Sequence, residues 1–197
     1  AEEIERDLLS THTVQTGQLC VGTGPYPLET IVTPALTRFV STHPLVRVRL
    51  RLADWDVLLL WLRSRELDFF VAEISTLRSE PDLVVEPLPT HALYFVGRPD
   101  HPLARRKDVK LSDTFAFPFA APARIPPRLL APMLSAKARS ADGASLARPF
   151  PAIECNAVST VKHVVEGSDA LTALTLSCMA TELLARRLVL IGSEPWL

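Results

Sequence analysis

The stretch from Leu45 to Leu52, Leu-Val-Arg-Val-Arg-Leu-Arg-Leu, alternates aliphatic and charged side chains with a period of two. Successive side chains of a β-strand point to opposite faces of a sheet. The aliphatic residues from Val46 to Leu52 therefore predict a face on the core, and the three arginines between them predict a face in solvent. We expect a strand here with one buried face.

The residues before this strand predict another strand and a helix. Leu19–Gly22 is a short apolar run that indicates a strand, and from Leu28 to Phe39 the apolar residues recur at helical spacing. Pro27 suits the first turn of that helix, and His43-Pro44 ends it. Pro34 lies inside the helix, so we expect it to kink the helix or divide it into two pieces.

The residues after Leu52 continue the alternation of helix and strand. Trp55, Leu58, Leu59 and Leu62 form a second helical stripe, and Leu67–Val71 reads as a buried strand. The chain up to Val71 thus predicts β-α-β-α-β. Strands that alternate with helices imply a parallel sheet with crossover connections.

The second half repeats this theme after a stretch rich in proline and alanine. We expect helices near Arg128–Lys137, Ala157–Glu166 and Ser177–Arg187, and strands at 92–96, 152–155, 170–174 and 188–191. Gly167 stands where a helix C-cap belongs. The sequence therefore predicts an α/β fold of two lobes, each a sheet of parallel type flanked by helices.

Composition limits the kind of protein. Of 197 residues, 48% are hydrophobic and 22% are charged, which is enough for a packed core. The net charge of -1 leaves no basic excess for gripping DNA phosphates, so we expect no direct DNA contact by this chain. Cys20, Cys155 and Cys178 lack metal-ligand spacing and are expected to be buried or half-buried free thiols.

Signals for secretion, membrane insertion and catalysis are not visible in the sequence. The first residues are charged, and no apolar run reaches the roughly 20 residues of a membrane span, so we expect a cytoplasmic protein. Val21-Gly22-Thr23-Gly24 begins like a dinucleotide loop, but Pro25 and Pro27 follow and no third glycine opens the helix. Nucleophile elbows and phosphate loops are missing as well. We expect no enzyme, no cofactor and no metal.

Four segments, in order, resemble the effector-binding domain of LysR-type transcriptional regulators. They are Leu19–Gly22 with Pro34–Phe39 and His43–Val46; Leu62–Val71, which contains Leu67-Asp68; Val96–Ala104, which contains His101-Pro102-Leu103-Ala104; and Val164–Ala170. The last segment has Ser168-Asp169-Ala170 where the family usually has x-Gly-Ile. Together the segments cover residues 17–192, and their order is more specific than any one of them.

The resemblance implies a fold like that of periplasmic binding proteins, with two lobes joined by two crossover strands. Residues 1–16 would end a linker, 17–89 with 190–197 would form the first lobe, and 90–189 the second. A small-molecule effector, such as an organic acid or an amino-acid-like metabolite, would bind in the cleft between the lobes. Such folds bind ligands at the carboxyl ends of strands and at helix N-termini, whose free N–H groups favour anions.

Candidate ligand contacts follow from those positions. On the first lobe they are Thr23 as a hydroxyl, Gly24 as a close backbone approach and Tyr26 as a ring; the alternative is an ordinary turn. On the second lobe Asn156, Ser159 and Thr160 open a helix, where Asn156 is equally explained as its N-cap. Arg124, with Arg128 nearby, is expected to pair with a carboxylate or to be solvated. Thr172, near the end of its strand, completes the set.

Partners and alternatives also follow from the resemblance. Leu60 and Trp61 make their helix apolar on most sides, which fits either burial or a subunit contact in a homodimer or higher homo-oligomer. DNA would be bound through a winged helix-turn-helix outside this sequence, and no membrane is involved. A periplasmic-type solute receptor is the alternative with the same fold, and a small α/β enzyme is a third.

Overall fold

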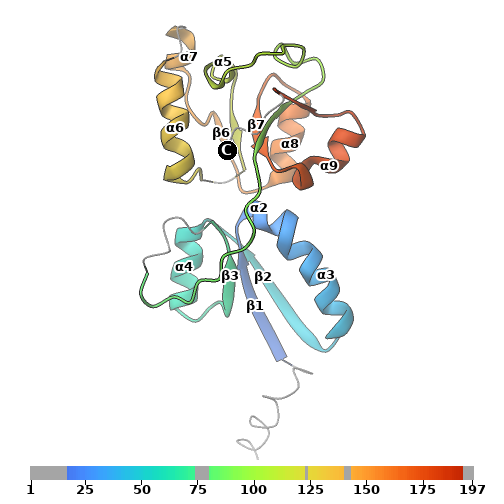
Figure 1. Ribbon diagram of the computed structural model, residues 1–197. Helices are drawn as coiled ribbons and strands as arrows, with labels where there is room; N and C mark the ends of the chain where they lie inside the picture. Colours follow the sequence, from blue (N-terminus) through green and yellow to red (C-terminus); the bar gives the residue numbers. More distant parts are fainter. Residues whose placement is uncertain (1–16, 74–79, 123, 140–142, 193–197) are drawn as a thin grey trace, which may run out of the picture. The chain divides into compact units, whose positions relative to one another are not determined.

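The computed structural model describes residues 17–73, 80–122, 124–139 and 143–192. The chain divides into two compact units, Ala1–Ala72 and Glu73–Leu197, which are considered one at a time (Figure 1). The family resemblance implied a first lobe of residues 17–89 with 190–197. Leu190 lies in a strand of the second unit, and residues 193–197 are outside the described ranges.

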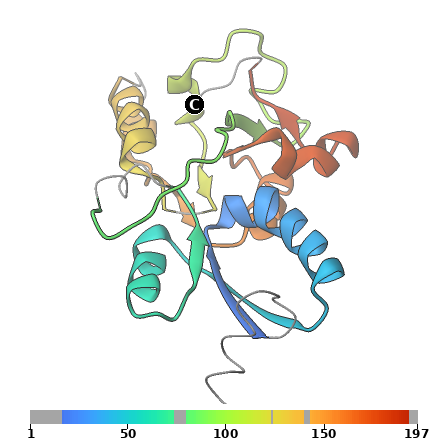
Figure 2. The same ribbon diagram turned by 60° about the horizontal axis from the view of Figure 1, so that its bottom comes forward.

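The first unit is a three-stranded parallel sheet with helices on both faces, as the β-α-β-α-β pattern predicts. β1 is the central strand, in the order β2-β1-β3. Figures 1 and 2 show α3 and α4 on opposite faces of this sheet. The elements are β1 (Gly17–Thr23), α2 (Pro25–Pro27), the π-helical segment η1 (Leu28–Val32), α3 (Thr33–Thr42), β2 (Val46–Leu52), α4 (Trp55–Arg63) and β3 (Phe69–Val71).

Pro34 divides the first long helix, as the sequence predicted, and it does so through a π turn. A proline in an α-helix clashes with the carbonyl four residues earlier. Here η1 widens the helix just before Pro34, and the N–H of Thr33 donates to the carbonyl of Leu28, five residues back. A π turn of this kind accommodates one extra residue without ending the helix. Helix α3 then ends at Thr42, before His43.

Among the described residues, the core of the first unit is packed tightly at Gly22. Leu58, Leu67 and Ala53 are buried against the inner face of β1. A Cβ atom on Gly22 would lie 2.6 Å from Leu67 Cδ1 and 2.8 Å from Leu58 Cδ2, so only glycine lets this strand approach α4 so closely. By contrast, Leu50 and Leu52, which were expected on the core face of β2, are exposed.

The second unit contains short strands and more helices than the sequence indicated. Its elements are β4 (Tyr94–Gly97), α5 (Leu111–Thr114), β5 (Ala120–Ala121), α6 (Pro127–Ala138), α7 (Gly143–Ala147), β6 (Ile153–Glu154), α8 (Val158–Glu166), β7 (Thr172–Leu174), α9 (Leu176–Leu184) and β8 (Val189–Leu190). Helices α5 and α7 and strand β5 were not predicted. All three are five residues or fewer, too short for a period to be recognised.

The strands of the second unit form two small sheets, β7-β4-β8 and β5-β6. β5 and β6 pair in parallel, and a parallel bridge joins Phe119 to Leu171 just before β7. β4 runs antiparallel to both β7 and β8. The expected parallel pairing is therefore found for β5 with β6, but not for β4 with its two neighbours. The direction of β4 depends on pairing with residues more than 70 positions away, which no local pattern reports.

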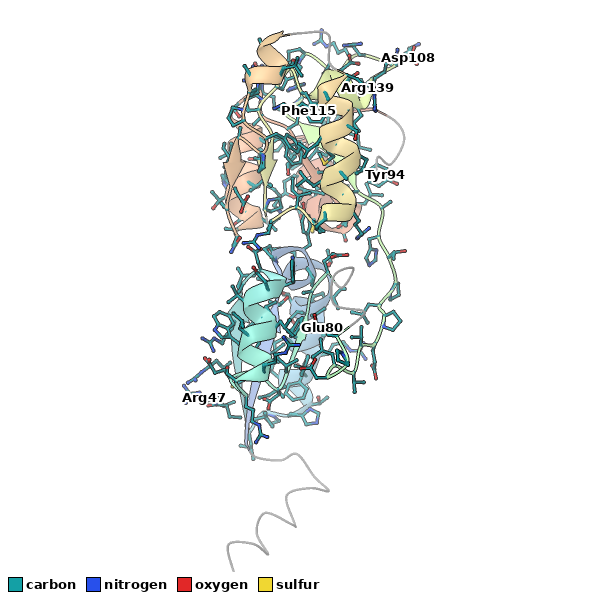
Figure 3. All side chains as sticks on the ribbon, turned by 90° about the vertical axis from the view of Figure 1, so that its left-hand side faces the viewer. Arg47, Glu80, Tyr94, Asp108, Phe115 and Arg139 are labelled. Carbon is teal, nitrogen blue, oxygen red and sulfur yellow. The ribbon has the colours of Figure 1, made fainter. Side chains whose placement is uncertain are left out.

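Aromatic rings fill the core of the second unit. Phe95 and Phe119 meet edge to face at 5.8 Å between ring centroids, and Phe150 stacks on Phe119 at 5.1 Å. Phe115 meets Phe150 at 5.2 Å and lies inside the unit, whereas Arg139 marks the outer end of α6 (Figure 3). In Figure 1, α6 covers one side of this unit and α8 and α9 the other. Aromatic contacts of this kind add specific geometry to the burial of apolar area.

The turn that follows β4 is held by His101. The N–H of Leu103 donates to Nδ1 of His101, which leaves Nε2 to donate to the carbonyl of Asp169 at 3.3 Å. The side chain of Arg98 also reaches Asp169, with Nη2 2.9 Å from Oδ1. Burial is the main cause that lowers the pKa of His101, so the ring stays neutral in this turn. Asp169, which departs from the family pattern, therefore supports this turn through Arg98 and His101. Ser168, which also departs from it, supports its own segment, where its Oγ accepts from the N–H of Ala170.

Candidate functional site

The carboxyl edge of the first sheet holds Thr23, Gly24 and Tyr26, as expected. β1 ends at Thr23, and the parallel strands β2 and β3 end at the same edge. Thr23 is fully buried, and its hydroxyl donates to the carbonyl of Gly24 at 3.0 Å. Its hydrogen is thus already used within the turn, which supports the structural alternative for this hydroxyl.

Gly24 begins the helical segment that follows β1. Its N–H donates to the carbonyl of Val71 at 3.0 Å, and its carbonyl accepts from Leu28. A Cβ atom on Gly24 would make only ordinary contacts, 3.6 Å from Pro27 and 4.0 Å from Ala72, so the turn itself does not require a glycine here. Tyr26 is half-buried, and its carbonyl accepts from the hydroxyl of Thr30.

Trp55 adds an unassigned donor at this edge. It begins α4, directly after Asp54, where β2 has ended. Its indole Nε1 is enclosed and has no hydrogen-bond partner among the described residues. Buried donors of this type normally have a partner. Sequence reasoning placed Trp55 only in the apolar stripe of its helix, because periodicity reports the face of a residue and not the needs of its polar atom.

The carboxyl edge of the second sheet gathers most of the predicted polar contacts. β5 and β6 are parallel, so the loop after β5 and the loop after β6 leave the sheet at the same edge. The first loop leads to Arg124 and Arg128, and the second leads to Asn156, Ser159 and Thr160. All five of these residues are exposed. This edge therefore offers two guanidinium groups and three small polar side chains to solvent.

Asn156 is not the N-cap of α8, which corrects the sequence interpretation. The N-cap is Ala157, and no side chain caps this end. The N–H of Ala157 instead donates to Sγ of Cys155 at 3.4 Å. A helix N-terminus without a side-chain cap leaves its first N–H groups for solvent or for a ligand. The helix begins at Val158 instead of Ala157, so the cap position falls on Ala157 and not on Asn156.

Arg128 forms an ion pair that the sequence did not reveal. Its Nε lies 2.8 Å from Oε1 of Glu73. The two residues are 55 positions apart, so no local pattern connects them. Arg124, four residues earlier, is exposed.

Thr172 lies at the start of β7, not near its end as the sequence suggested. It is fully buried, pairs with Val96 of β4, and its hydroxyl has no hydrogen-bond partner among the described residues. The strand proved shorter at its beginning than the run Ala170–Leu174 predicted. The other proposed contacts of this unit lie beyond strand ends, whereas Thr172 lies within the sheet.

A charged cluster braces α8 against α9. Lys162 Nζ lies 2.9 Å from Glu182 Oε1, and Arg187 approaches the same oxygen at 3.4 Å. Desolvation raises the pKa of Glu182, but the hydrogen bond from Lys162 and the charges of Lys162 and Arg187 outweigh it, so that pKa lies below its ordinary value. Glu182 is therefore ionised at neutral pH, and the cluster fixes the helix whose N-terminus lies at the polar edge.

The described part of the chain shows no group of three or more His, Cys, Asp or Glu side chains that could hold a metal ion. Cys20 and Cys155 are half-buried free thiols, and Cys178 is a buried one. Within the described residues, no helix has both the length and the hydropathy that crossing a membrane requires.

Comparisons with known proteins identify the family. Residues 12–196 match the family model of the LysR substrate binding domain. The chain is 36% identical over 184 residues to the SDS degradation transcriptional activation protein of Pseudomonas sp.. The matched region is 92% of this chain and 57% of that protein. The chain thus spans little more than half the length of this relative.

Solved structures agree with the family. The C-terminal domain of a probable LysR family regulator from Rhodococcus sp. RHA1 is 26% identical, with a TM-score of 0.59 over 81% of this chain and 74% of that one. The regulatory domain of CcmR from Synechocystis, in complex with 2-PG, has a TM-score of 0.67 at 18% identity, over 91% of this chain and 83% of that one. The latter likeness shows the fold.

The family match decides between the readings that the sequence left open. A periplasmic solute receptor would share the fold, but the match runs to a regulator domain over nearly the whole chain. The family consists of regulators, not of enzymes. The chain belongs to the LysR substrate-binding domains, the small-molecule-binding part of LysR-type transcriptional regulators.

Proposed function

We propose that this chain senses a small organic anion and that it binds the acidic group at the carboxyl edge of the second sheet. The observation that carries the proposal is the set of exposed polar groups there: Asn156, Ser159 and Thr160 at the N-terminus of α8, with Arg124 in the loop after β5 and Arg128 in the first turn of α6. N–H groups at a helix N-terminus and guanidinium groups both favour carboxylates, sulfates and phosphates.

The name of a relative narrows the compounds worth testing. The SDS degradation transcriptional activation protein is named for the degradation of SDS, which is an alkyl sulfate. An alkyl sulfate or a fatty acid joins an anionic head to an apolar chain. Thr23, Gly24 and Tyr26 of the first unit, with the enclosed Trp55 donor at the same edge of their sheet, are retained as proposed ligand contacts. Thr172 remains a weaker proposal, because its hydroxyl lies within the sheet.

We also propose that the chain catalyses no reaction and that the whole regulator acts in the cytoplasm as a homodimer or a higher homo-oligomer. DNA would be bound through a separate N-terminal domain. Support for a subunit contact comes from α4, where Leu60 is exposed while Trp61 is half-buried beneath the guanidinium of Arg51, 3.8 Å from its ring centroid. Replacing Leu60 with Asp should lower the molar mass measured by light scattering if α4 lies in the contact.

The effector proposal is tested by a thermal-shift series with octyl sulfate, octanoate and octanol, kept far below micelle-forming concentrations. A ligand at one hundred times its dissociation constant should stabilise the chain by about 2.7 kcal/mol, which is several degrees for a domain of this size. We expect the two anions to stabilise the chain and neutral octanol to have little effect. Equal effects of octanol and octyl sulfate would contradict an anion site.

The place of the anion is tested with a charge at the helix N-terminus. In Ser159→Asp, the new carboxylate favours the positive end of α8 and so should not unfold it, but it repels an incoming anion. Thr181→Asp adds the same charge to an exposed position of α9. We expect Ser159→Asp to abolish the octyl sulfate shift and Thr181→Asp to retain it. Loss in both variants, or in neither, would argue against this edge.

A further inference from the structure

The ion pair between Arg128 and Glu73 lies at a special point of the chain. Both residues belong to the second unit, but Glu73 directly follows Ala72, the last residue of the first unit. Arg128 lies in the first turn of α6. The Nε–Oε1 distance is 2.8 Å, with 56% of the arginine side chain and 25% of the glutamate side chain exposed. The pair therefore anchors the start of the connecting segment to α6.

The pair also lies at the edge where we propose that the effector's acid binds. α6 follows β5, and the loop between them leaves the sheet at the same edge as the loop before α8. Among the described residues, Arg128 uses only Nε, and only toward Glu73. A guanidinium group has five N–H donors and can bind a carboxylate or a sulfate through two of them. Glu73 thus binds the guanidinium of Arg128 through one donor only, although this group could bind an anion through two.

We propose that Glu73 is an internal counter-ion of Arg128 and that the acidic group of the effector replaces it. This inference rests on the proposed function. An ion pair whose arginine is more than half exposed contributes little to stability, so an external anion exchanges with it at a small cost. The exchange releases Glu73 from α6 at the residue where the chain leaves the first unit. Anion binding and the anchoring of the connecting segment are thereby coupled through one arginine.

The coupling predicts opposite effects of removing the two charges. Glu73→Gln removes the internal competitor, whereas Arg128→Met removes the group for which both anions compete. If the ion pair is closed about nine-tenths of the time, only about one-tenth of the wild-type molecules can bind the anion at any moment. Glu73→Gln makes all of them competent, so its apparent affinity should be about tenfold higher. The matched controls are Glu86→Gln in the connecting segment and Arg139→Met at the end of α6, both exposed.

The experiment measures binding of octyl sulfate and of octanoate by calorimetry to the wild-type chain and the four variants at low salt. We expect Glu73→Gln to bind about tenfold more tightly, Arg128→Met to bind at least about tenfold more weakly, and the controls to match the wild type. In parallel, hydrogen exchange of the amides in 80–92 and 127–132 is followed without ligand. Exchange there should rise in Glu73→Gln, and octyl sulfate should raise it in the wild type.

The outcomes separate this inference from the proposed function. Equal affinities of the wild type and Glu73→Gln, with binding intact, would overturn the counter-ion role and leave the anion sensor standing. Binding by Arg128→Met at wild-type strength would do the same. Binding of neither probe by any variant would overturn the anion sensor, and the exchange of Glu73 with it. Binding by Glu73→Gln alone would support both, with an internal pair stronger than expected.

Discussion

The strands of the two units are buried to very different degrees. In the second unit, β7 is buried along its whole length, and β4 is buried from Phe95 to Gly97. In the first unit, β2 has one buried residue, Val46, and Phe69 of β3 is exposed. β4 and β7 are thus enclosed within their unit, whereas the side chains of β2 and β3 are mostly half-buried or exposed.

The difference shows how the core of each unit is packed. The core of the second unit contains several aromatic rings packed with aliphatic side chains. The first unit is packed tightly around Gly22, so small changes of volume there should be felt strongly. Four predictions test this contrast, from the largest expected effect to the smallest.

Phe95→Ala should be the most damaging single change. Phe95 is 0% exposed and lies at the centre of the second core, in contact with Phe119. Removing a buried ring costs about 3–5 kcal/mol, which includes the cavity left behind. Urea unfolding measures the loss, and Leu184→Ala, at a position that is 87% exposed, is the control with little expected change. A loss similar to that of the control would mean that the ring cluster does not support the unit.

Gly22→Ala should destabilise the first unit by about 1–3 kcal/mol, the usual cost of overfilling a packed core. The added methyl group would come within 2.6 Å of Leu67 and 2.9 Å of Phe70. Gly24→Ala, two residues later, meets nothing closer than 3.6 Å and should be tolerated. Unfolding curves of the two variants give the comparison. If both are tolerated, the first core is looser than its contacts indicate.

Thr172→Val and Thr175→Val should change stability in opposite directions. The hydroxyl of Thr172 is buried without a partner among the described residues, so an isosteric methyl group should add about 1 kcal/mol to the free energy of unfolding. The hydroxyl of Thr175 accepts from the N–H of Cys178 as the N-cap of α9, so its loss should cost about 1 kcal/mol. Chemical unfolding measures both. If Thr172→Val loses octyl sulfate binding and Thr175→Val retains it, the hydroxyl of Thr172 contacts the ligand.

His101 should make the second unit sensitive to mild acid. Burial lowers its pKa in the folded chain, so the unfolded chain binds the proton more readily. The stabilisation by neutral His101 is complete above the unfolded pKa of about 6.5 and is lost as the pH falls from there toward the lower folded pKa. Unfolding free energies at pH 7.5 and 5.5 should differ more in the wild type than in His101→Gln. Equal differences would remove His101 as the cause.

Local periodicity was sufficient for the larger elements. The alternation from Leu45 to Leu52 predicted β2, and the stripe around Leu58 predicted α4. The same alternation wrongly placed Leu50 and Leu52 in the core. A period of two tells which side chains share a face, but not whether anything covers that face.

For the candidate site, the sequence indicated an edge of the sheet rather than individual contacts. The order of strands and helices placed Ser159 and Thr160 at an exposed carboxyl edge. It did not give the sulfur of Cys155 as the acceptor at Ala157, nor the pairing of Arg128 with Glu73. The first depends on one residue of helix register, and the second on a tertiary contact. Neither produces a repeating pattern along the chain.

The π turn before Pro34 has a consequence for chain length. One residue more than an α-helix needs lies between Leu28 and Thr33, and each residue rotates an α-helix by about 100°. Deleting one residue there would shift α3 by one position and turn its face by roughly that angle. The outward side chains of α3 could therefore be exchanged as a set by a single codon deletion, without altering any of them. Related chains that differ by one residue at this point should present different surfaces on the same helix.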